Sequence, residues 1–346
     1  PKETEALIIN NSEGNPFYIQ ELIYSLVDQN ILVRQENDGK WRLTGKINSL
    51  DLPASLQTLL SSRIDRLAPE EKDVLQVASI IGSVFWFSVL QELVGDAYPL
   101  KKILAGLQRA QIIQENGQVS ELGMQYAFRS NLMRDAAYES MLSPQRSAYH
   151  LRIAEYMEAN ISANVLSGYD GLLTYHYRNA GRAEKELYYT LQAARQAQAI
   201  YANADALAHY NRALDLVELI EGATEIHGRL EAAQSIKFEI LDGRIDIHYR
   251  MGNLAMGNAD ARALLPLAEQ MKDNTPWMID ALLRQPEVTN PSRQQLEKGL
   301  VISQRALDLS RKIGTREREL RSMMSLTNCA YLQRNPLYRE TAQRAL

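Results

Sequence analysis

Residues 112–120, IIQENGQVS, decide how the first half of this chain folds. Two short segments with strand-forming residues flank Glu115-Asn116-Gly117, and an Asn-Gly pair in such a place predicts a β-hairpin. Three segments with helical spacing of apolar residues precede it, at residues 70–81, 86–94 and 99–110. Three helices followed by a hairpin form a winged helix, which we therefore predict over residues 51–143.

A smaller unit precedes the predicted winged helix, at residues 1–50. Residues 16–29, PFYIQELIYSLVDQ, keep apolar side chains on one side of a helix, with Pro16 in its first turn. Residues 31–35 and 40–44 then flank a turn that ends in Asp38-Gly39, which predicts a second hairpin. We expect one helix and one hairpin in this unit.

The second half of the chain has the pattern of stacked helices. An amphipathic helix at residues 144–168 is expected to link the winged helix to residues 169–346. In that region small side chains recur at i, i+4 and i+7, as in Ala206, Tyr210 and Ala213, in Gly299, Ser303 and Ala306, and in Tyr338, Ala342 and Ala345. Small side chains let paired helices approach closely, which predicts an α-solenoid of tetratricopeptide-like helical hairpins. We expect Pro266 and residues 285–291 to kink or interrupt helices.

Composition and charge are those of an ordinary globular protein. The 346 residues carry a net charge of −4, which gives no general attraction to nucleic acid or to acidic membranes. The single cysteine, Cys329, cannot form an internal disulfide, which favours a reducing, cytoplasmic location. The uncharged stretch 74–90 is too short and too polar to predict a membrane span. A start without Met and a helical ending indicate a segment of a longer protein.

Residues 14–138 resemble the C-terminal part of STAND-type signalling ATPases, where an ATPase module ends and a winged helix follows. Large bacterial regulators and class III nucleotide cyclases contain this arrangement together with helical repeats. The resemblance rests on four stretches, EGNPFYIQEL at 13–22, LPASL at 52–56, SRIDRL at 62–67 and ASIIGSVF at 78–85. It implies that residues 1–50 are the end of an ATPase module, and that ATP or ADP could bind the parent protein.

The same resemblance implies candidate nucleotide contacts. A Gly-x-Pro element touches the nucleotide in the family, which makes Gly14 and Pro16 candidates; the alternative is a plain loop before a helix. The family also carries a Phe-Arg-His-x-Leu run whose histidine approaches the phosphates of ADP. Here residues 128–132 read FRSNL, so Arg129 could supply charge, whereas Ser130 cannot titrate near neutral pH. The alternative for Ser130 is an ordinary position between a strand and a helix.

Tyrosines concentrate at the start of the predicted repeats. Tyr175, Tyr177 and Tyr189 could line a concave groove that binds a protein partner or a small inducer. At helical spacing such rings could instead fill the core of the helical hairpins. Both interpretations stay open from the sequence.

The sequence contains no evident catalytic or metal-binding constellation. It lacks the G-x-x-x-x-G-K-[ST] loop that cradles phosphates, so we expect this chain to hydrolyse no ATP and to need no cofactor of its own. The five histidines are scattered and lack the spacing of a metal site. We expect His176 to be a packed or hydrogen-bonded side chain.

The predicted function is regulatory. A winged helix suggests DNA binding, but residues 51–145 hold 8 Lys/Arg against 11 Asp/Glu, a balance of −3, which favours a structural role. We expect a protein-interaction segment of a multidomain signal-transduction ATPase, which contacts its own upstream ATPase domain and neither nucleic acid nor membrane. Two alternatives remain: part of a transcriptional regulator that contacts DNA, or part of a nucleotide cyclase or kinase whose catalytic domain lies outside this chain.

Overall fold

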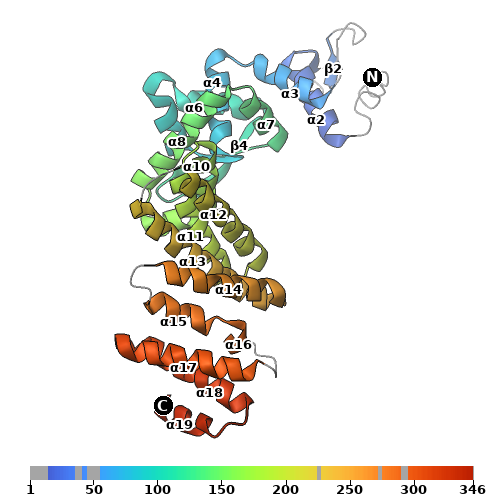
Figure 1. The fold of residues 1–346 in the computed structure, drawn as a ribbon. Helices are drawn as coiled ribbons and strands as arrows, with labels where there is room; N and C mark the ends of the chain where they lie inside the picture. The colour runs from blue at the N-terminus through green and yellow to red at the C-terminus, as the bar shows by residue number, and fades with distance from the viewer. Residues whose placement is uncertain are drawn as a thin grey trace. The chain divides into compact units, whose positions relative to one another are not determined.

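Helices make up most of the chain in the computed structural model (Figure 1). The chain divides into two units, Pro1–Arg182 and Ala183–Leu346, which we call unit 1 and unit 2. The described residues are 15–35, 41–44, 55–223, 227–271, 275–289 and 295–345. The mainly α fold class predicted from the sequence is confirmed.

Unit 1 begins with the helix and hairpin expected from the sequence. Helix α2 spans Pro16–Asp28, and the Asn15 side chain caps it by accepting hydrogen bonds from the main-chain N–H groups of Phe17 and Tyr18. Strands β1 (Leu32–Arg34) and β2 (Trp41–Leu43) pair antiparallel. The expected turn at Asp38-Gly39 lies outside the described residues. Helix α3 spans Leu56–Asp65.

A buried arginine joins these elements. The Arg63 guanidinium of α3 forms ion pairs with Glu21 and with Asp28 of α2, the latter at 3.2 Å. It also donates to the carbonyl oxygen of Ala110, at 2.8 Å. Arg63 and Glu21 are both buried, so removal of either one would leave an uncompensated charge. Arg63 therefore holds α2 and α3 against the residue that follows α6.

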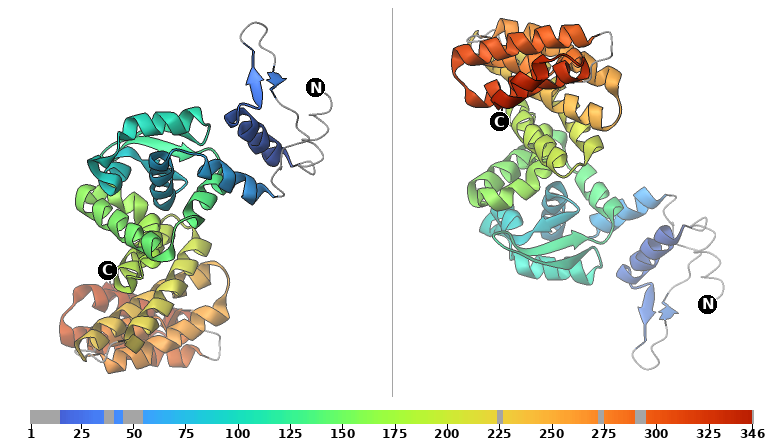
Figure 2. Two further views of the ribbon diagram at one scale, coloured as in Figure 1. Left: turned by 90° about the horizontal axis from the view of Figure 1, so that it is seen from above. Right: turned by 90° about the horizontal axis from the view of Figure 1, so that it is seen from below.

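The middle of unit 1 contains three helices and a three-stranded antiparallel sheet of order β3-β5-β4 (Figure 2). The helices are α4 (Pro69–Ile81), α5 (Phe87–Val94) and α6 (Leu100–Arg109), and the strands are β3 (Val84–Trp86), β4 (Ile113–Val119) and β5 (Gly123–Phe128). A short 3-10 turn, η2 (Gly95–Ala97), follows α5. Phe85 of β3 stacks on Tyr126 of β5, with ring centroids 5.7 Å apart.

The turn predicted at Asn116-Gly117 in the winged-helix region is wrong in position. Asn116 and Gly117 lie inside β4, where the pairing with β5 shifts between Glu115 and Gln118. Gly117 has a φ of 104°, and an extra residue with such a backbone conformation forms a bulge without ending a strand. The chain turns instead at residues 120–122, after Val119 pairs with Gly123.

Four helical elements and one 3-10 turn complete unit 1. They are α7 (Asn131–Glu139), α8 (Ser143–Asn160), α9 (Ala163–Leu166), η3 (Ser167–Tyr169) and α10 (Asp170–Asn179). Helix α8, expected as a linker, packs against α4, α5 and α10 and buries Ile153, Ala154 and Met157. The division between the units follows Arg182, so α10 lies in unit 1.

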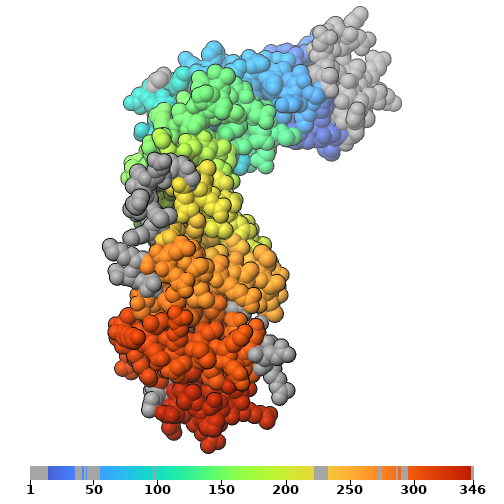
Figure 3. Space-filling view, viewed as in Figure 1, coloured from blue at the N-terminus to red at the C-terminus, as the bar shows by residue number. Residues whose placement is uncertain are grey.

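Unit 2 is an α-solenoid in which successive helices pack against one another in chain order (Figures 1 and 3). Its helices are α11 (Ala183–Ala199), α12 (Asn203–Ala223), α13 (His227–Arg250), α14 (Leu254–Gln270), α15 (Thr275–Leu283), α16 (Pro286–Thr289), α17 (Leu296–Ile313), α18 (Arg316–Leu332) and α19 (Leu337–Ala345). Helix α14 continues through Pro266, whereas residues 284–285 separate α15 from α16, as the proline-containing run predicts. The predicted solenoid is confirmed.

Small residues on α17 allow its close contacts. Gly299, Ser303 and Ala306 are buried, as the sequence pattern predicts. A Cβ atom at Gly299 would lie 2.2 Å from the carbonyl oxygen of Glu287 and 3.2 Å from the sulfur of Cys329. Side chains of α17 with this orientation therefore face α16 and α18, and no larger residue fits at position 299 without a backbone shift.

Ion pairs connect helices of unit 2 that are not consecutive. Arg284, just after α15, binds Asp242 and Asp246 of α13, with N–O distances from 2.5 to 3.3 Å. Arg318 of α18 donates to Asp280 of α15 at 2.8 Å. The Arg284 guanidinium is shared between two carboxylates, and the Arg318–Asp280 pair is partly buried. Charged hydrogen bonds of this kind have a fixed geometry, so they hold the helical hairpins in one stacking arrangement.

We predict that Gly299→Ala destabilises the protein by about 1–3 kcal/mol, because the added methyl group would meet a backbone oxygen. The matched control is Gly171→Ala in α10, where a Cβ meets no atom within 4 Å. That substitution should be neutral or stabilise by about 0.5–1 kcal/mol, since alanine favours a helix. Chemical denaturation of both variants checks the prediction, and equal stability of the two would contradict the packing described for α17.

Candidate partner-binding groove

The candidate nucleotide contacts do not form one site in the described residues. Gly14 lies outside them, and Pro16 is exposed in the first turn of α2. Arg129 is also exposed and lies between β5 and α7, where its main-chain N–H donates to the carbonyl of Ile112. None of the described members of this set lines either cavity discussed below.

Ser130 has a structural role in the fold. It is the N-cap of α7, and its Oγ accepts a hydrogen bond from the main-chain N–H of Met133 at 3.3 Å. A serine is well suited to this position because its side chain satisfies a donor that the first turn leaves free. The interpretation as a strand-to-helix position accounts for this geometry without a ligand.

The proposed tyrosine groove is wrong for two of its three members. Tyr177 is 1% exposed and Tyr189 is 6% exposed, so neither side chain is available to a partner. Burial and a hydrogen bond with Glu158 raise the pKa of Tyr177. Tyr175 is half-buried, and its hydroxyl accepts a hydrogen bond from the Arg134 guanidinium at 3.3 Å. These rings fill helix contacts, which is the alternative that the sequence left open.

Two histidines form a buried pair between α8 and α10. The Nδ1 atoms of His150 and His176 are 2.8 Å apart, and His150 Nε2 lies 3.1 Å from the Tyr138 hydroxyl of α7. Burial, followed by the charges of Arg134 and Arg146, lowers the pKa of His150 to about 4. Burial, and next His150 itself, lower the pKa of His176 to about 3. Both imidazoles are therefore neutral at physiological pH.

This pair is a packing element of unit 1. Nitrogen atoms at 2.8 Å share a hydrogen bond, which joins α8 to α10. In the part of the chain that the structure describes, no three His, Cys, Asp or Glu side chains gather as a metal site would require. The expectation of a packed His176 is confirmed.

We predict that neither imidazole of this pair takes up a proton between pH 7 and 5. The unfolded chain binds protons at these histidines near pH 6.5, whereas the folded chain does so only near their lowered pKa values. Stability should therefore fall as pH drops from about 6.5 towards 4. NMR titration of the two imidazole signals checks this, and a midpoint near pH 6.5 for either one would contradict it.

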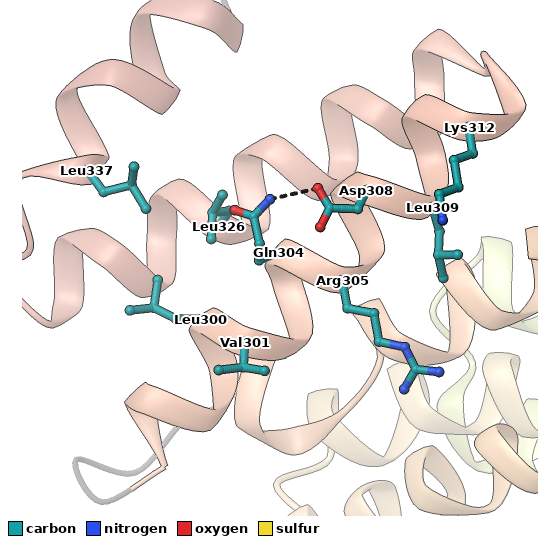
Figure 4. A pocket seen from close by; sticks show the side chains of 9 residues that line it. All are labelled: Leu300, Val301, Gln304, Arg305, Asp308, Leu309, Lys312, Leu326 and Leu337. Carbon is teal, nitrogen blue, oxygen red and sulfur yellow. Dashed lines mark hydrogen bonds between the residues drawn. The ribbon is translucent and has the colours of Figure 1, made fainter.

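An open groove lies along the outer side of α17. Its volume is about 660 Å³, and α17, α18 and α19 contribute its walls (Figure 4). The lining residues are Leu300, Val301, Gln304, Arg305, Asp308, Leu309, Lys312, Leu326 and Leu337. Seven of these lie on α17, opposite or beside the stripe that contains Gly299 and Ala306. The groove exists because α17 and α19 each pack on α18.

The groove has an apolar end and a charged end. Leu300, Val301, Leu326 and Leu337 gather at one end, and Arg305 and Lys312 lie towards the other (Figure 4). Val301 is 70% exposed, which is unusual for an aliphatic side chain beside three leucines. Leu300 and Leu337 are half-buried and Leu326 is buried, so Val301 is the exposed residue of an otherwise recessed apolar end, and a recessed apolar surface with nearby charges can accept a ligand.

The lining of the groove carries two cations, Arg305 and Lys312, and one carboxylate, Asp308. The Asp308 carboxylate between them accepts a hydrogen bond from Gln304 at 2.9 Å. By contrast, Arg311 on the same helix forms an ion pair with Glu319 at 3.1 Å. Among the described residues, Arg305 and Lys312 have no ion pair. With two cations and one carboxylate, the lining of the groove has a net charge of +1.

A smaller cavity of about 290 Å³ lies in unit 1. It is lined by Asp73, Gln76, Val77, Leu93, Val94, Tyr98, Met141, Gln145 and Tyr149. Three of its polar side chains already form hydrogen bonds, since Tyr98 donates to Asp73 at 2.9 Å and Gln76 donates to Ser140 at 2.8 Å. We therefore take the α17 groove as the candidate site.

No protein-family profile and no curated protein sequence matches the chain. Among solved structures, it is similar to a Signal Transduction ATPase with Numerous Domains (STAND) protein with a tetratricopeptide repeat sensor, from Pyrococcus horikoshii. The identity is 15% and the TM-score 0.40, over 100% of this chain and 50% of that one. The chain thus spans half the length of that protein, and a likeness at this level assigns no activity.

One further observation concerns membranes. In the residues that the structure describes, no helix has both the length and the apolar character needed to cross a bilayer.

Proposed function

We propose that this chain is a regulatory, protein-interaction segment of a signal-transduction ATPase, and that unit 2 binds the partner. The observation that carries the proposal is the groove on α17, with its exposed Val301 and unpaired cations. A solenoid suits this role because stacked hairpins offer a long, rigid surface. The partner would be a protein segment or a small inducer, and the cytoplasm would be the place of action.

Unit 1 would connect the groove-bearing unit to an upstream ATPase domain. We assign its α4–β5 region to the winged-helix class and α2 with β1 and β2 to the end of the ATPase module. Arg63 supports this assignment, because a movement of α2 would be transmitted through its ion pairs to α3 and Ala110. ATP or ADP would bind the parent protein, and this chain would not itself be an enzyme.

Contact with DNA is the weaker alternative. Lys101 and Lys102 are exposed on α6, but the region around them has an excess of acidic residues. Phosphate binding requires a basic surface, so the acidic balance favours a structural winged helix.

We predict that peptides selected from a displayed random library against the whole chain bind the α17 groove. Val301→Asp should weaken the selected peptides at least about tenfold, because it places a carboxylate in the apolar end. The matched control is Met324→Asp, since Met324 is an exposed apolar residue of unit 2 that does not line the groove. Calorimetric titration measures both variants.

The control should bind the peptides as the unchanged chain does. If every enriched peptide binds the Val301→Asp variant with unchanged affinity, the groove is not the recognition site and the proposed function loses its support.

A further inference from the structure

We infer that the occupant of the α17 groove is an acidic amphipathic helix of a partner protein. The inference rests on the proposed function and specifies the chemistry of the partner. It is carried by the shape of the groove, by the distribution of its apolar side chains and by the positions of its two unpaired cations.

The shape of the groove suits a helix. It follows α17 from Leu300 to Lys312, which is about 18 Å at a rise of 1.5 Å per residue. Its two sides are the side chains of α17 and Leu337 of α19, and Leu326 of α18 is buried below them. A groove between neighbouring helices accepts the apolar face of a third helix, with anchors at i, i+3 or i+4, and i+7.

The cations set the charge and the spacing of the partner. Arg305 and Lys312 are seven residues apart on α17, or about 10.5 Å along its axis. Two carboxylates seven residues apart on a partner helix that runs along α17 have the same spacing. Asp308, already bonded to Gln304, lies between the cations and would repel a third carboxylate midway between the first two.

The same features disfavour other occupants. A basic helix would place like charges against Arg305 and Lys312, and such juxtaposition costs binding energy. A nucleic acid would place phosphates near Asp308 and would leave Val301 and Leu300 without apolar partners. A neutral apolar helix would cover the two cations without neutralising them.

Two synthetic helices test the inference. Each is about 18 residues long so that it can be helical, and both carry the same leucine face. One has glutamates at two positions seven residues apart, and the other has lysines there. We expect the acidic helix to bind the whole chain at least about tenfold more tightly, and the preference to weaken with added salt.

A pair of double variants separates local from general charge effects. Arg305→Glu with Lys312→Glu should abolish or reverse the preference for the acidic helix. Lys298→Glu with Arg316→Glu changes the net charge equally but alters exposed residues that do not line the groove, so the preference should remain. Circular dichroism confirms that both variants are folded.

The outcomes distinguish the inference from the proposed function. Three results would overturn the inference. They are equal affinity for the two helices, an equal loss of the preference for the acidic helix in both double variants, and binding of neither helix. If displayed peptides still depend on Val301 in that case, the groove remains a recognition site for a partner of different charge. If they do not, the proposed function fails as well.

Discussion

The close approach of α17 to its neighbours determines the surface that unit 2 presents. Gly299 lies against the carbonyl of Glu287 and the sulfur of Cys329, and a side chain there would collide with both. Ser303 and Ser310 continue the same buried stripe, where Ser310 contacts Ser322 of α18 at 3.0 Å. This contact fixes the rotation of α17 about its axis, because a helix with one face so tightly packed cannot turn without a clash.

The rotation of α17 in turn selects which of its residues face solvent. With the small residues directed inward, Val301, Arg305 and Lys312 are left on the outer surface. In the proposed function a partner would cover these residues, and packing and recognition would use opposite faces of one helix.

Unit 1 also depends on buried polar groups. Arg63 connects α2 to α3 through Glu21 and Asp28, and the His150–His176 pair connects α8 to α10. Such contacts tolerate little change, because loss of one partner leaves the other buried and unsatisfied. They specify how the helices of unit 1 fit together more strictly than apolar contacts of the same size would.

The solenoid and most helices could be predicted from the sequence, because periodicity and small-residue spacing are local signals. The position of the turn between β4 and β5 could not be predicted, because Asn116 and Gly117 suit a bulge as well as a turn. Only the pairing of Val119 with Gly123 shows that they form a bulge. Burial of Tyr177 and Tyr189 depends on which helices meet, which spacing alone does not reveal. The groove could have been found, because the stripe at Gly299 and Ala306 already places Val301 and Arg305 on the other face.

Hydrogen–deuterium exchange of the whole chain with and without a bound acidic helix tests the central claim most directly. The account predicts slower exchange in residues 296–313 and 337–345, where the backbone lines the groove, and unchanged exchange in α11 and α12. Protection confined to α11 and α12, with none in α17 or α19, would contradict it.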